Sequence, residues 1–305
     1  MKIAVVGTGL IGASIGLAAR ERLGAQVAGV DPDPAPALAV GAVDEAVPLA
    51  AALDGAEAAF VAVPMQVLAD TVAAVVAAAP EDCLVTDTGS VKRPVVEAVS
   101  DERFVGGHPL AGAERGGAAA ARAELFEGAT WYLTPTSATS GIHLERLHRL
   151  LAGLGARPSV IEADAHDRVM ATVSHLPHVL ANVLVEQASG ALGGEALPAT
   201  GPSFRDATRV AGANSAIWTD IYLSNADALG VRLDDAIARL NAFRDDLRAG
   251  DAGAITAWND AAATDRRRLL EAGLAGGPTH ELRVSVPNRP GVVAELALAL
   301  GRAGV

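Results

Sequence analysis

The chain has 305 residues, of which 50% are hydrophobic and 20% are charged, and its formal net charge is -12. This composition excludes a disordered chain, and the length allows roughly two domains, each with a full core. The negative charge argues against nucleic acid as a partner, because phosphate binding requires a basic stripe, and no apolar run reaches the roughly 18 residues of a membrane span.

The chain begins with a short apolar run, residues 3–6, that leads into a glycine-rich turn made of Gly7, Thr8, Gly9, Leu10, Ile11 and Gly12. Glycines at this spacing between a strand and a helix allow a tight turn, backbone approach to a pyrophosphate, and close helix packing. The pyrophosphate then meets the positive end of the helix dipole. The segment therefore predicts a dinucleotide-binding unit, and the alternative is a secretory signal peptide.

Asp31 ends the second apolar run, about 20 residues past the glycines, where such folds place a carboxylate for the ribose hydroxyls. This carboxylate would repel a 2′-phosphate, and residues 32–34 contain no Arg or Lys to receive one. The sequence therefore favours NAD over NADP as cofactor.

The first half of the chain alternates apolar runs with helix-forming segments, which is typical of a parallel sheet covered by helices. We predict a Rossmann-type, doubly wound α/β domain over residues 1–162, with strands at 3–6, 26–30, 59–63, 84–87, 104–107, 130–134 and 160–161. Val63 and Pro64 mark the carboxyl end of one strand, where open α/β sheets bind ligands, so we place them at the cofactor. The single cysteine, Cys83, precedes an apolar pair; it favours a buried thiol and a cytoplasmic protein.

From residue 163 the strand signals stop and long helices follow, with a break rich in Gly and Pro at 189–203. We predict an all-α domain over 163–275, which binds substrate and forms a homodimer. Residues 281–305 indicate a strand, a turn and a helix, and resemble the first unit of an ACT domain, a small module that commonly senses amino acids. Residues 280–305 are too short to fold alone, so this segment either is truncated or docks on the rest, and no ligand site is assigned to it.

Two strand ends carry polar groups that suit proton transfer. His108 lies between glycines in the segment 106–112, which we expect to be a loop at the carboxyl edge of the sheet. An imidazole there is suited to take a proton from an alcohol as hydride leaves the same carbon. The alternative is a loop histidine bonded to backbone. Ser90, in the polar segment 87–92, could hold a hydroxyl beside it.

Three histidines lie on the first long helix, at positions 166, 175 and 178. At 100° per residue, His175 and His178 lie about 60° apart, whereas His166 lies about half a turn from His175. A metal site seeded by His175 and His178 is conceivable, but the faces do not converge without further ligands, so we predict no metal. Histidines satisfied in a polar seam near Pro177 are the structural alternative.

Two arginines, Arg205 and Arg209, are followed along the chain by Trp218. Either arginine could clamp a carboxylate through a bidentate fork. The alternative is surface pairing with Asp206, which is common at helical spacing. The residues alone do not decide between these two interpretations.

Five motifs, in this order, resemble the prephenate dehydrogenase family over about residues 1–275: GTGLIG at 7–12, DTGSVK at 87–92, GHPLAG at 107–112, VSHLPH at 173–178 and FRDATR at 204–209. The resemblance implies NAD-dependent oxidative decarboxylation of prephenate to 4-hydroxyphenylpyruvate in tyrosine biosynthesis. The resemblance implies that His108, helped by Ser90, accepts the proton or the hydrogen bond of the hydroxyl on the prephenate ring. It assigns substrate binding to His178, Arg209 and Trp218. The loop before Phe204 departs from the family pattern in having fewer glycines.

Other functions remain open at this point. An arogenate dehydrogenase performs the same chemistry on a substrate with an amino group. A β-hydroxyacid dehydrogenase would need a catalytic lysine, and residues 168–209 contain none. A non-catalytic, NAD-responsive regulator would bind NAD without turnover. The roles of His166 and His175, the carboxylate met by Arg209, the oligomeric state and inhibition by tyrosine are not determined by the sequence.

Overall fold

The computed structural model describes residues 1–113, 115–191, 200–274, 287 and 290–302. Its sheet has the strand order β3-β2-β1-β4-β5-β6-β7-β8. The strands are β1 Lys2–Val6, β2 Gln26–Val30, β3 Glu45–Ala46, β4 Ala58–Val61, β5 Leu84–Asp87, β6 Phe104–Pro109, β7 Thr130–Thr134 and β8 Arg157–Val160. The predicted strands are present, although β4 ends two residues earlier than expected and β8 begins three residues earlier. The two-residue β3 was not predicted.

Strand direction departs from the prediction of a parallel sheet at one place. All neighbouring strands are parallel except β6 and β7, which are antiparallel. Parallel neighbours need a crossover connection, usually a long helix. The described residues of this connection, 110–113 and 115–129, contain only two short 3-10 helices, η1 Ala118–Ala120 and η2 Ala123–Phe126, and the chain returns beside β6 in the opposite direction.

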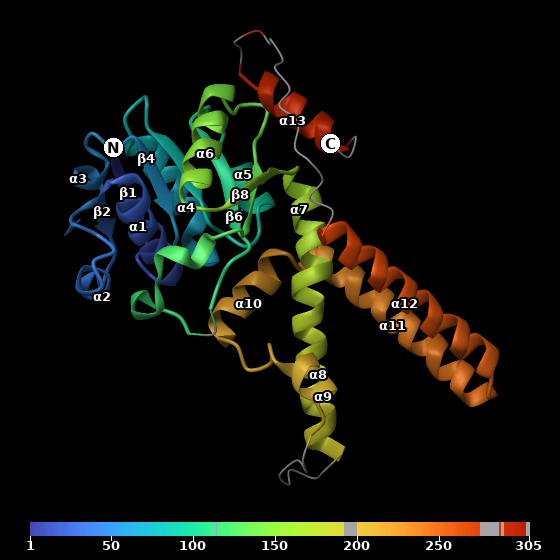
Figure 1. Cartoon of the computed structure of the whole chain (residues 1–305). Coiled ribbons are helices and arrows are strands. Elements are labelled where there is room, and N and C mark those ends of the chain that lie inside the picture. Colours follow the sequence, from blue (N-terminus) through green and yellow to red (C-terminus); the bar gives the residue numbers. More distant parts are fainter. Residues whose placement is uncertain (114, 192–199, 275–286, 288–289, 303–305) are drawn as a thin grey trace. The chain divides into compact units, whose positions relative to one another are not determined.

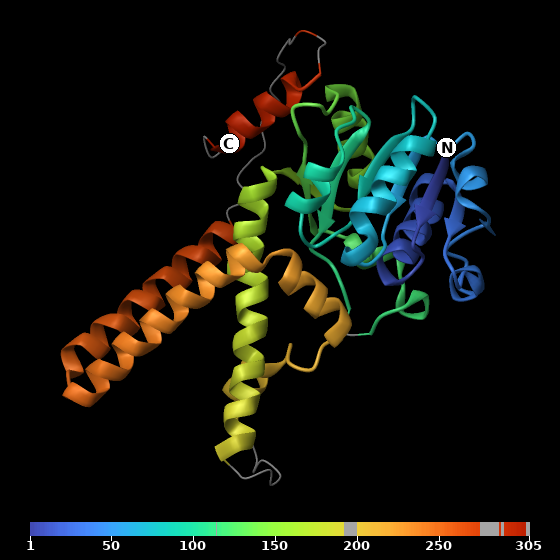
Figure 2. The ribbon, with the colours of Figure 1, turned by 180° about the vertical axis from the view of Figure 1, so that it is seen from behind.

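Helices cover both faces of the sheet, as predicted for a doubly wound domain. One face, towards the viewer in Figure 1, packs α1 (Leu10–Leu23), α2 (Ala35–Ala39) and α6 (Gly141–Gly153). The other face, towards the viewer in Figure 2, packs α3 (Leu49–Leu53), α4 (Met65–Ala78) and α5 (Arg93–Ala98). In the first layer the ring of Trp131 contacts the rings of Phe60 and Phe126, with centroids 6.3 and 5.0 Å apart.

The second half of the described chain is helical, as predicted. Its helices are α7 Ala163–Met170, the π turn η3 Ala171–His175, α8 Leu176–Ala191, α9 Pro202–Thr208, α10 Ser215–Ser224, α11 Ala226–Ala249 and α12 Ala252–Leu274. Asn214 starts α10, because its side-chain oxygen accepts hydrogen bonds from two backbone N–H groups of the first turn. None of the described helices is long and apolar enough to cross a bilayer.

Contacts divide the chain into two compact units, Met1–Leu229 with Pro287–Val305, and Gly230–Val286. This division differs from the predicted boundary at residue 162, because α7 and α10 pack on the sheet domain and α8 and α9 pack on each other between them. Gln66 on α4, for example, donates a hydrogen bond to the buried carboxylate of Asp220 on α10. Within the second unit, α11 and α12 pack through Phe243 and Trp258, whose ring centroids lie 4.8 Å apart.

The predicted C-terminal strand lies mostly outside the described residues, and the predicted helix is α13 (Val292–Arg302). The backbone N–H of Gly291 donates to the carbonyl of Thr139 over 2.9 Å. Gly141, the first residue of α6, gives room to Val293, since a Cβ at that glycine would lie 2.5 Å from the valine Cγ2. The described part of the C-terminal segment therefore docks on the sheet domain.

Candidate active site

Two glycines of the turn, Gly7 and Gly12, have no space for a side chain, whereas Gly9 does. Gly7 has φ +89°, and a Cβ there would lie 2.4 Å from the carbonyl oxygen of Ala62. A Cβ on Gly12 would lie 1.9 Å from the carbonyl oxygen of Gly7. A Cβ on Gly9 would meet nothing within 4 Å. Gly9 therefore leaves exposed backbone open for a ligand at the N-terminus of α1.

Asp31 lies beside this turn, as the sequence predicts. Its Oδ2 accepts a hydrogen bond from the backbone N–H of Thr8 over 2.7 Å, and its Oδ1 accepts one from Asp33 over 2.9 Å. The hydroxyl of Thr8 is buried and has no hydrogen-bond partner in the described chain. Open backbone, an unpartnered hydroxyl and a fixed carboxylate are features that a dinucleotide site needs, so these residues fit NAD.

The remaining predicted cofactor residues lie close in the chain to these groups. Leu10 and Ile11 form the half-buried first turn of α1. Val63 and Pro64 follow the end of β4, which pairs in parallel with β1. The carboxyl ends of these two strands therefore lie at the same edge of the sheet.

His108 is a strand residue, which corrects the prediction that it lies on a loop. It is the last residue but one of β6 and lies opposite Tyr132 of β7. The glycines before it serve packing: a Cβ on Gly106 would lie 2.3 Å from Thr134 Oγ1, and one on Gly107 would lie 2.6 Å from the carbonyl oxygen of Asp87. Because β6 continues the parallel part of the sheet that contains β1, His108 lies at the carboxyl edge that also carries the glycine turn.

His108 lies at the end of a buried series of hydrogen-bonded side chains. Its Nδ1 lies 2.9 Å from Nε2 of His166, and Nδ1 of His166 lies 2.7 Å from Oδ1 of Asp167. Burial, with the neighbouring His166 and the Lys92 ammonium, holds the pKa of His108 well below its ordinary value. His108 is therefore a neutral imidazole at neutral pH and can accept a proton.

A fully buried ion pair lies behind this strand end. Lys92 Nζ contacts the carboxylate of Asp87 and donates to the carbonyl of Gly107 over 2.7 Å. Asp87 also accepts hydrogen bonds from the backbone N–H groups of Gly89 and Gly107, over 2.8 and 3.0 Å. Burial lowers the pKa of Lys92 despite its partner. Ser90 lies half-buried in the turn that these bonds hold.

His175 is also buried, and it is joined to the same hydrogen-bond network. Its Nδ1 lies 3.2 Å from Nδ2 of Asn225, and that amide donates to the backbone carbonyl of Asp167 over 2.8 Å. Burial lowers the pKa of His175 to about 4. The half-turn projection of His166 and His175 assumes a regular α-helix, and the π turn Ala171–His175 interrupts that regular period.

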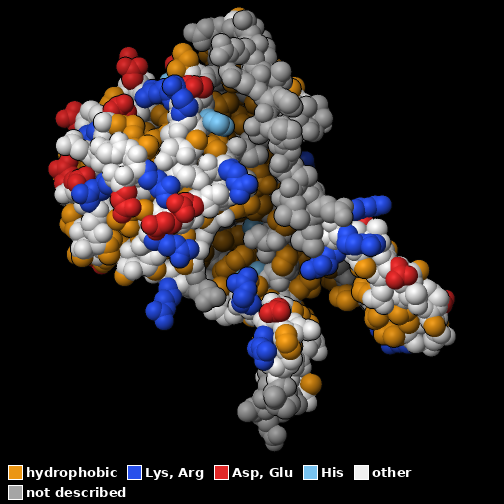
Figure 3. Space-filling model, viewed as in Figure 1, with side chains coloured by type: hydrophobic (Ala, Val, Ile, Leu, Met, Phe, Trp, Pro, Cys, Tyr) orange, Lys and Arg blue, Asp and Glu red, His pale blue; other side chains and the backbone are white. Residues whose placement is uncertain are grey.

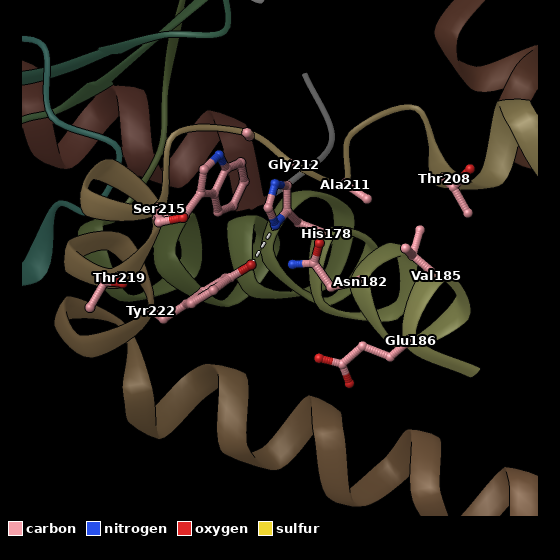
Figure 4. A pocket seen from close by; sticks show the side chains of 12 residues that line it. His178, Asn182, Val185, Glu186, Thr208, Ala211, Gly212, Ser215, Thr219 and Tyr222 are labelled. Carbon is pink, nitrogen blue, oxygen red and sulfur yellow. Dashed lines mark hydrogen bonds between the residues drawn. The ribbon is translucent and has the colours of Figure 1, made fainter. Parts of the chain in front are cut away.

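His178 and Trp218 meet in a pocket of about 570 Å³ (Figure 4). The imidazole stacks on the indole with centroids 3.6 Å and planes 13° apart, and its Nδ1 bonds the hydroxyl of Tyr222 over 2.5 Å. The other lining residues are Asn182, Val185, Glu186, Thr208, Ala211, Gly212, Ala213, Ser215 and Thr219. The pocket thus offers an aromatic wall with polar groups on α8 and α10.

The other predicted site residues do not line this pocket. His108 and Ser90 lie at the sheet edge, and Arg209 is exposed just after α9. Arg205 donates to the carbonyl of Thr200 rather than pairing with Asp206. Figure 3 shows Lys and Arg side chains interspersed with Asp and Glu over the visible face of the sheet domain.

Sequence reasoning missed Asn225 and Tyr222, and it gave no role to Lys92. Asn225 carries no local signal, since only the fold brings α10 beside α7. Lys92 could have been suspected from its spacing to Asp87 across a strand end. Among the described residues, no group of three His, Cys, Asp or Glu side chains is arranged to hold a metal ion.

A glycine-turn nucleotide domain with a neutral histidine at its carboxyl edge, continued by a helical region, defines an NAD-dependent dehydrogenase. Residues 15–160 match the family model described as prephenate dehydrogenase, nucleotide-binding domain, and residues 162–259 match prephenate dehydrogenase, dimerization domain. The chain belongs to the prephenate dehydrogenase family.

Individual relatives agree with this assignment. The chain is 33% identical to prephenate dehydrogenase of Bacillus subtilis over 98% of its length and 84% of the relative's. It is similar to the crystal structure of Synechocystis arogenate dehydrogenase, with TM-score 0.76 and 30% identity over 88% of this chain and all of the other. It is also similar to prephenate dehydrogenase of A. aeolicus in complex with hydroxyphenyl propionate and NAD+, with TM-score 0.79 and 26% identity over 88% and 98% of the chains.

Proposed function

We propose that this chain catalyses the NAD-dependent oxidative decarboxylation of prephenate to 4-hydroxyphenylpyruvate, a step towards tyrosine. NAD, when bound, supplies the acceptor for the hydride that leaves the hydroxyl-bearing ring carbon. His108 holds or takes the proton of that hydroxyl while its oxygen forms a carbonyl. Loss of carbon dioxide from the opposite ring carbon returns an electron pair to the ring, and the oxygen of the aromatic product regains the proton.

One observation carries this proposal: His108 is a buried, neutral imidazole at the sheet edge that also carries the glycine turn and Asp31. A general base must be unprotonated before the reaction, and burial keeps the pKa of His108 well below its ordinary value. Ser90, three residues past the buried Asp87, is proposed to share the hydroxyl of the substrate. The aromatising substrate supplies much of the driving force, so the main work of the protein is alignment.

The helical region is proposed to hold the rest of the substrate. Trp218 and His178 supply an apolar wall with a polar edge, which suits a ring that carries a side chain. Arg209 is exposed and has no ion-pair partner in the described chain, so its guanidinium is free to bind a carboxylate of the substrate. An acidic protein needs such a local cation to bind a dicarboxylate.

Arogenate is the second candidate substrate, because the similar Synechocystis structure is an arogenate dehydrogenase. The test is NADH formation, followed by absorbance at 340 nm, with each substrate and with NAD and NADP. We expect kcat/KM to favour prephenate and NAD. A tenfold preference for arogenate would overturn the substrate assignment, and absence of NADH with both substrates would favour the regulator.

We propose that the chain forms a homodimer through the helical domain, residues 163–275, and acts in the cytoplasm. The matched dimerization domain supports the first proposal, as do the exposed apolar side chains of α11 and α12, such as Leu240 and Trp258. The single, buried Cys83 supports the second. Light scattering on the purified protein tests the dimer, and a monomeric mass at micromolar concentration would refute it.

We further propose a domain boundary near residue 162 and an ACT-like C-terminal segment. Residues 1–162 form the functional NAD-binding domain, supported by family matches that change between residues 160 and 162. Residues 280–305 are ACT-like, supported by the docked helix α13 after a turn at Gly291. An experimental structure with no strand before α13 would refute the ACT-like assignment.

A further inference from the structure

Four polar residues behind His108 form a branched, buried network that the reaction proposed above does not use. The first branch runs from Asp167 through His166 to His108, and the second from the Asp167 backbone through Asn225 to His175. All five of these side chains are less than a tenth exposed, and His166 is fully buried against the ring of Tyr132. A buried network of this kind is stable only with each hydrogen in a defined place.

We infer that Asp167 is a positioning residue whose two branches give His108 and His175 opposite tautomers, so that His108 presents a bare nitrogen and His175 presents an N–H. This inference rests on the proposed function only in giving His108 the role of base. The tautomers themselves follow from which atoms can donate and which can only accept.

In the first branch, the carboxylate of Asp167 can only accept. Its oxygens already take the backbone N–H groups of Lys92 and Arg93 over 2.8 and 2.9 Å. Burial would raise the pKa of Asp167, but these bonds and the one to His166 hold it below its ordinary value. The carboxylate is therefore ionised, and Nδ1 of His166 must carry a hydrogen.

The next bond follows from the first. Burial lowers the pKa of His166, so the ring is neutral and its Nε2 carries a lone pair. The 2.9 Å bond to His108 then requires the hydrogen on Nδ1 of His108. Nε2 of His108 is left bare, which is the state that a base for the substrate hydroxyl needs.

The second branch fixes the opposite pattern. The atom of Asn225 that lies 2.8 Å from the Asp167 carbonyl must be the amide nitrogen, because a carbonyl only accepts. The same nitrogen lies 3.2 Å from Nδ1 of His175, so that ring nitrogen accepts. His175 is neutral, since its pKa is about 4, and its one hydrogen is on Nε2. His175 can therefore donate to a carbonyl or carboxylate but cannot accept at that atom.

The first experiment measures the tautomers directly, by long-range ¹H–¹⁵N correlation spectra of the full chain labelled with ¹⁵N-histidine. Expected are Nδ1–H for His108 and His166 and Nε2–H for His175, with the exposed His148 as an internal reference. Single substitutions of each histidine by Asn assign the signals. Nε2–H on His108, or Nδ1–H on His175, overturns the inference. The spectra need neither substrate nor NAD, so their result is independent of the proposed reaction.

The second experiment removes the acceptor while keeping the shape. In Asp167→Asn the amide can still accept from backbone but can also donate to His166, which reverses the preferred tautomers of His166 and His108. We expect kcat to fall about 10²- to 10⁴-fold, the range seen when a catalytic imidazole is held in the wrong tautomer, with KM for NAD within twofold. The control is Asp164→Asn, an exposed carboxylate on the same helix, which should leave kcat unchanged.

A third pair of variants covers the case in which Asp167→Asn does not fold. His166→Gln keeps an oxygen that can accept from His108 Nδ1, whereas His166→Leu does not. We expect the Gln variant to keep at least a tenth of wild-type kcat and the Leu variant to lose about 10²-fold or more. Equal losses in both variants, or loss in Asp167→Asn with unchanged tautomers, would show a merely structural role and overturn the inference.

Discussion

Substitution of Gly9 is expected to weaken NAD binding while leaving the stability of the protein nearly unchanged. Substitution of Gly9 by Ala adds a methyl group that meets nothing within 4 Å in the protein. The backbone of Gly9 is extended, with φ -68°, and lies outside the left-handed region that favours glycine. The protein therefore has room for the methyl group, and only a ligand that approaches this backbone would collide with it.

The two expected magnitudes differ widely. Replacing Gly by Ala at a helix N-cap costs about 1 kcal/mol, and the smaller entropy of the unfolded chain offsets about 0.4–1 kcal/mol of this. The free energy of unfolding should thus change by less than about 1 kcal/mol. Blocking one charge-assisted hydrogen bond to the pyrophosphate removes about 1.5–3 kcal/mol of binding, which raises Kd for NAD about 10- to 100-fold.

Isothermal titration measures the Kd for NAD, and urea unfolding measures the free energy of unfolding. Gly190→Ala is the matched control, since a methyl group there also meets open space but lies on α8, and its Kd should equal that of the wild type. Gly12→Ala is the opposite case, because its Cβ would lie 1.9 Å from the Gly7 carbonyl oxygen, and it should lose about 3 kcal/mol or more of stability. Wild-type NAD affinity in a folded Gly9→Ala protein would refute the placement of the pyrophosphate at this turn.

Four further predictions concern the site. His108→Asn should lower kcat about 10²-fold or more in steady-state assays with little change in substrate KM, and near wild-type turnover would exclude His108 as the base. Arg209→Ala should chiefly raise KM through a lost charge-assisted contact, and a change confined to kcat would contradict this role. Lys92→Met leaves the buried Asp87 carboxylate without its cation and should cost about 3–5 kcal/mol in urea unfolding; a loss below about 1 kcal/mol would show that the pair is dispensable. The acid limb of the kcat/KM profile should have its midpoint below pH 6.5. Burial, together with His166, Lys92 and His175, lowers the pKa of His108, so this base stays neutral until the pH falls below that value. A midpoint above pH 6.5 would contradict this expectation.

The sheet was predictable because buried parallel strands are continuous apolar runs between turn residues. The direction of β7 was not predictable, since no pattern in the sequence of residues 110–129 indicates that β7 runs antiparallel to β6. The edge strand β3, two residues long, carries too short a pattern to be seen.

The glycines around His108 show why local patterns misplace a site residue. Gly106 and Gly107 suggested a flexible loop, whereas in the structure they admit Thr134 and Asp87 at distances that any Cβ would block. The same residue type therefore marks close packing inside a strand. A flexible loop and a tightly packed strand can be told apart only by contacts between distant segments, and a single sequence does not show these contacts.

The network around Asp167 was partly predictable. The adjacent pair His166 and Asp167 is visible in the sequence, but its partner Lys92 backbone lies 75 positions away and Asn225 lies 58 positions away. Such long-range bonds depend on how α7 packs against α5 and α10. The predicted substrate-binding residues Trp218 and His178 do meet, because α10 and α8 bring them to the lining of one pocket.

The π turn between α7 and α8 has a consequence for how this chain tolerates changes of length. A regular α-helix would put residues 166 and 175 about half a turn out of phase, whereas both side chains join the network around Asp167. The wider turn at Ala171–His175 corrects the phase. The spacing between the His-Asp pair and the His-Leu-Pro-His segment is thus fixed as strictly as the residues themselves, so a single insertion or deletion there would be as damaging as the loss of a histidine.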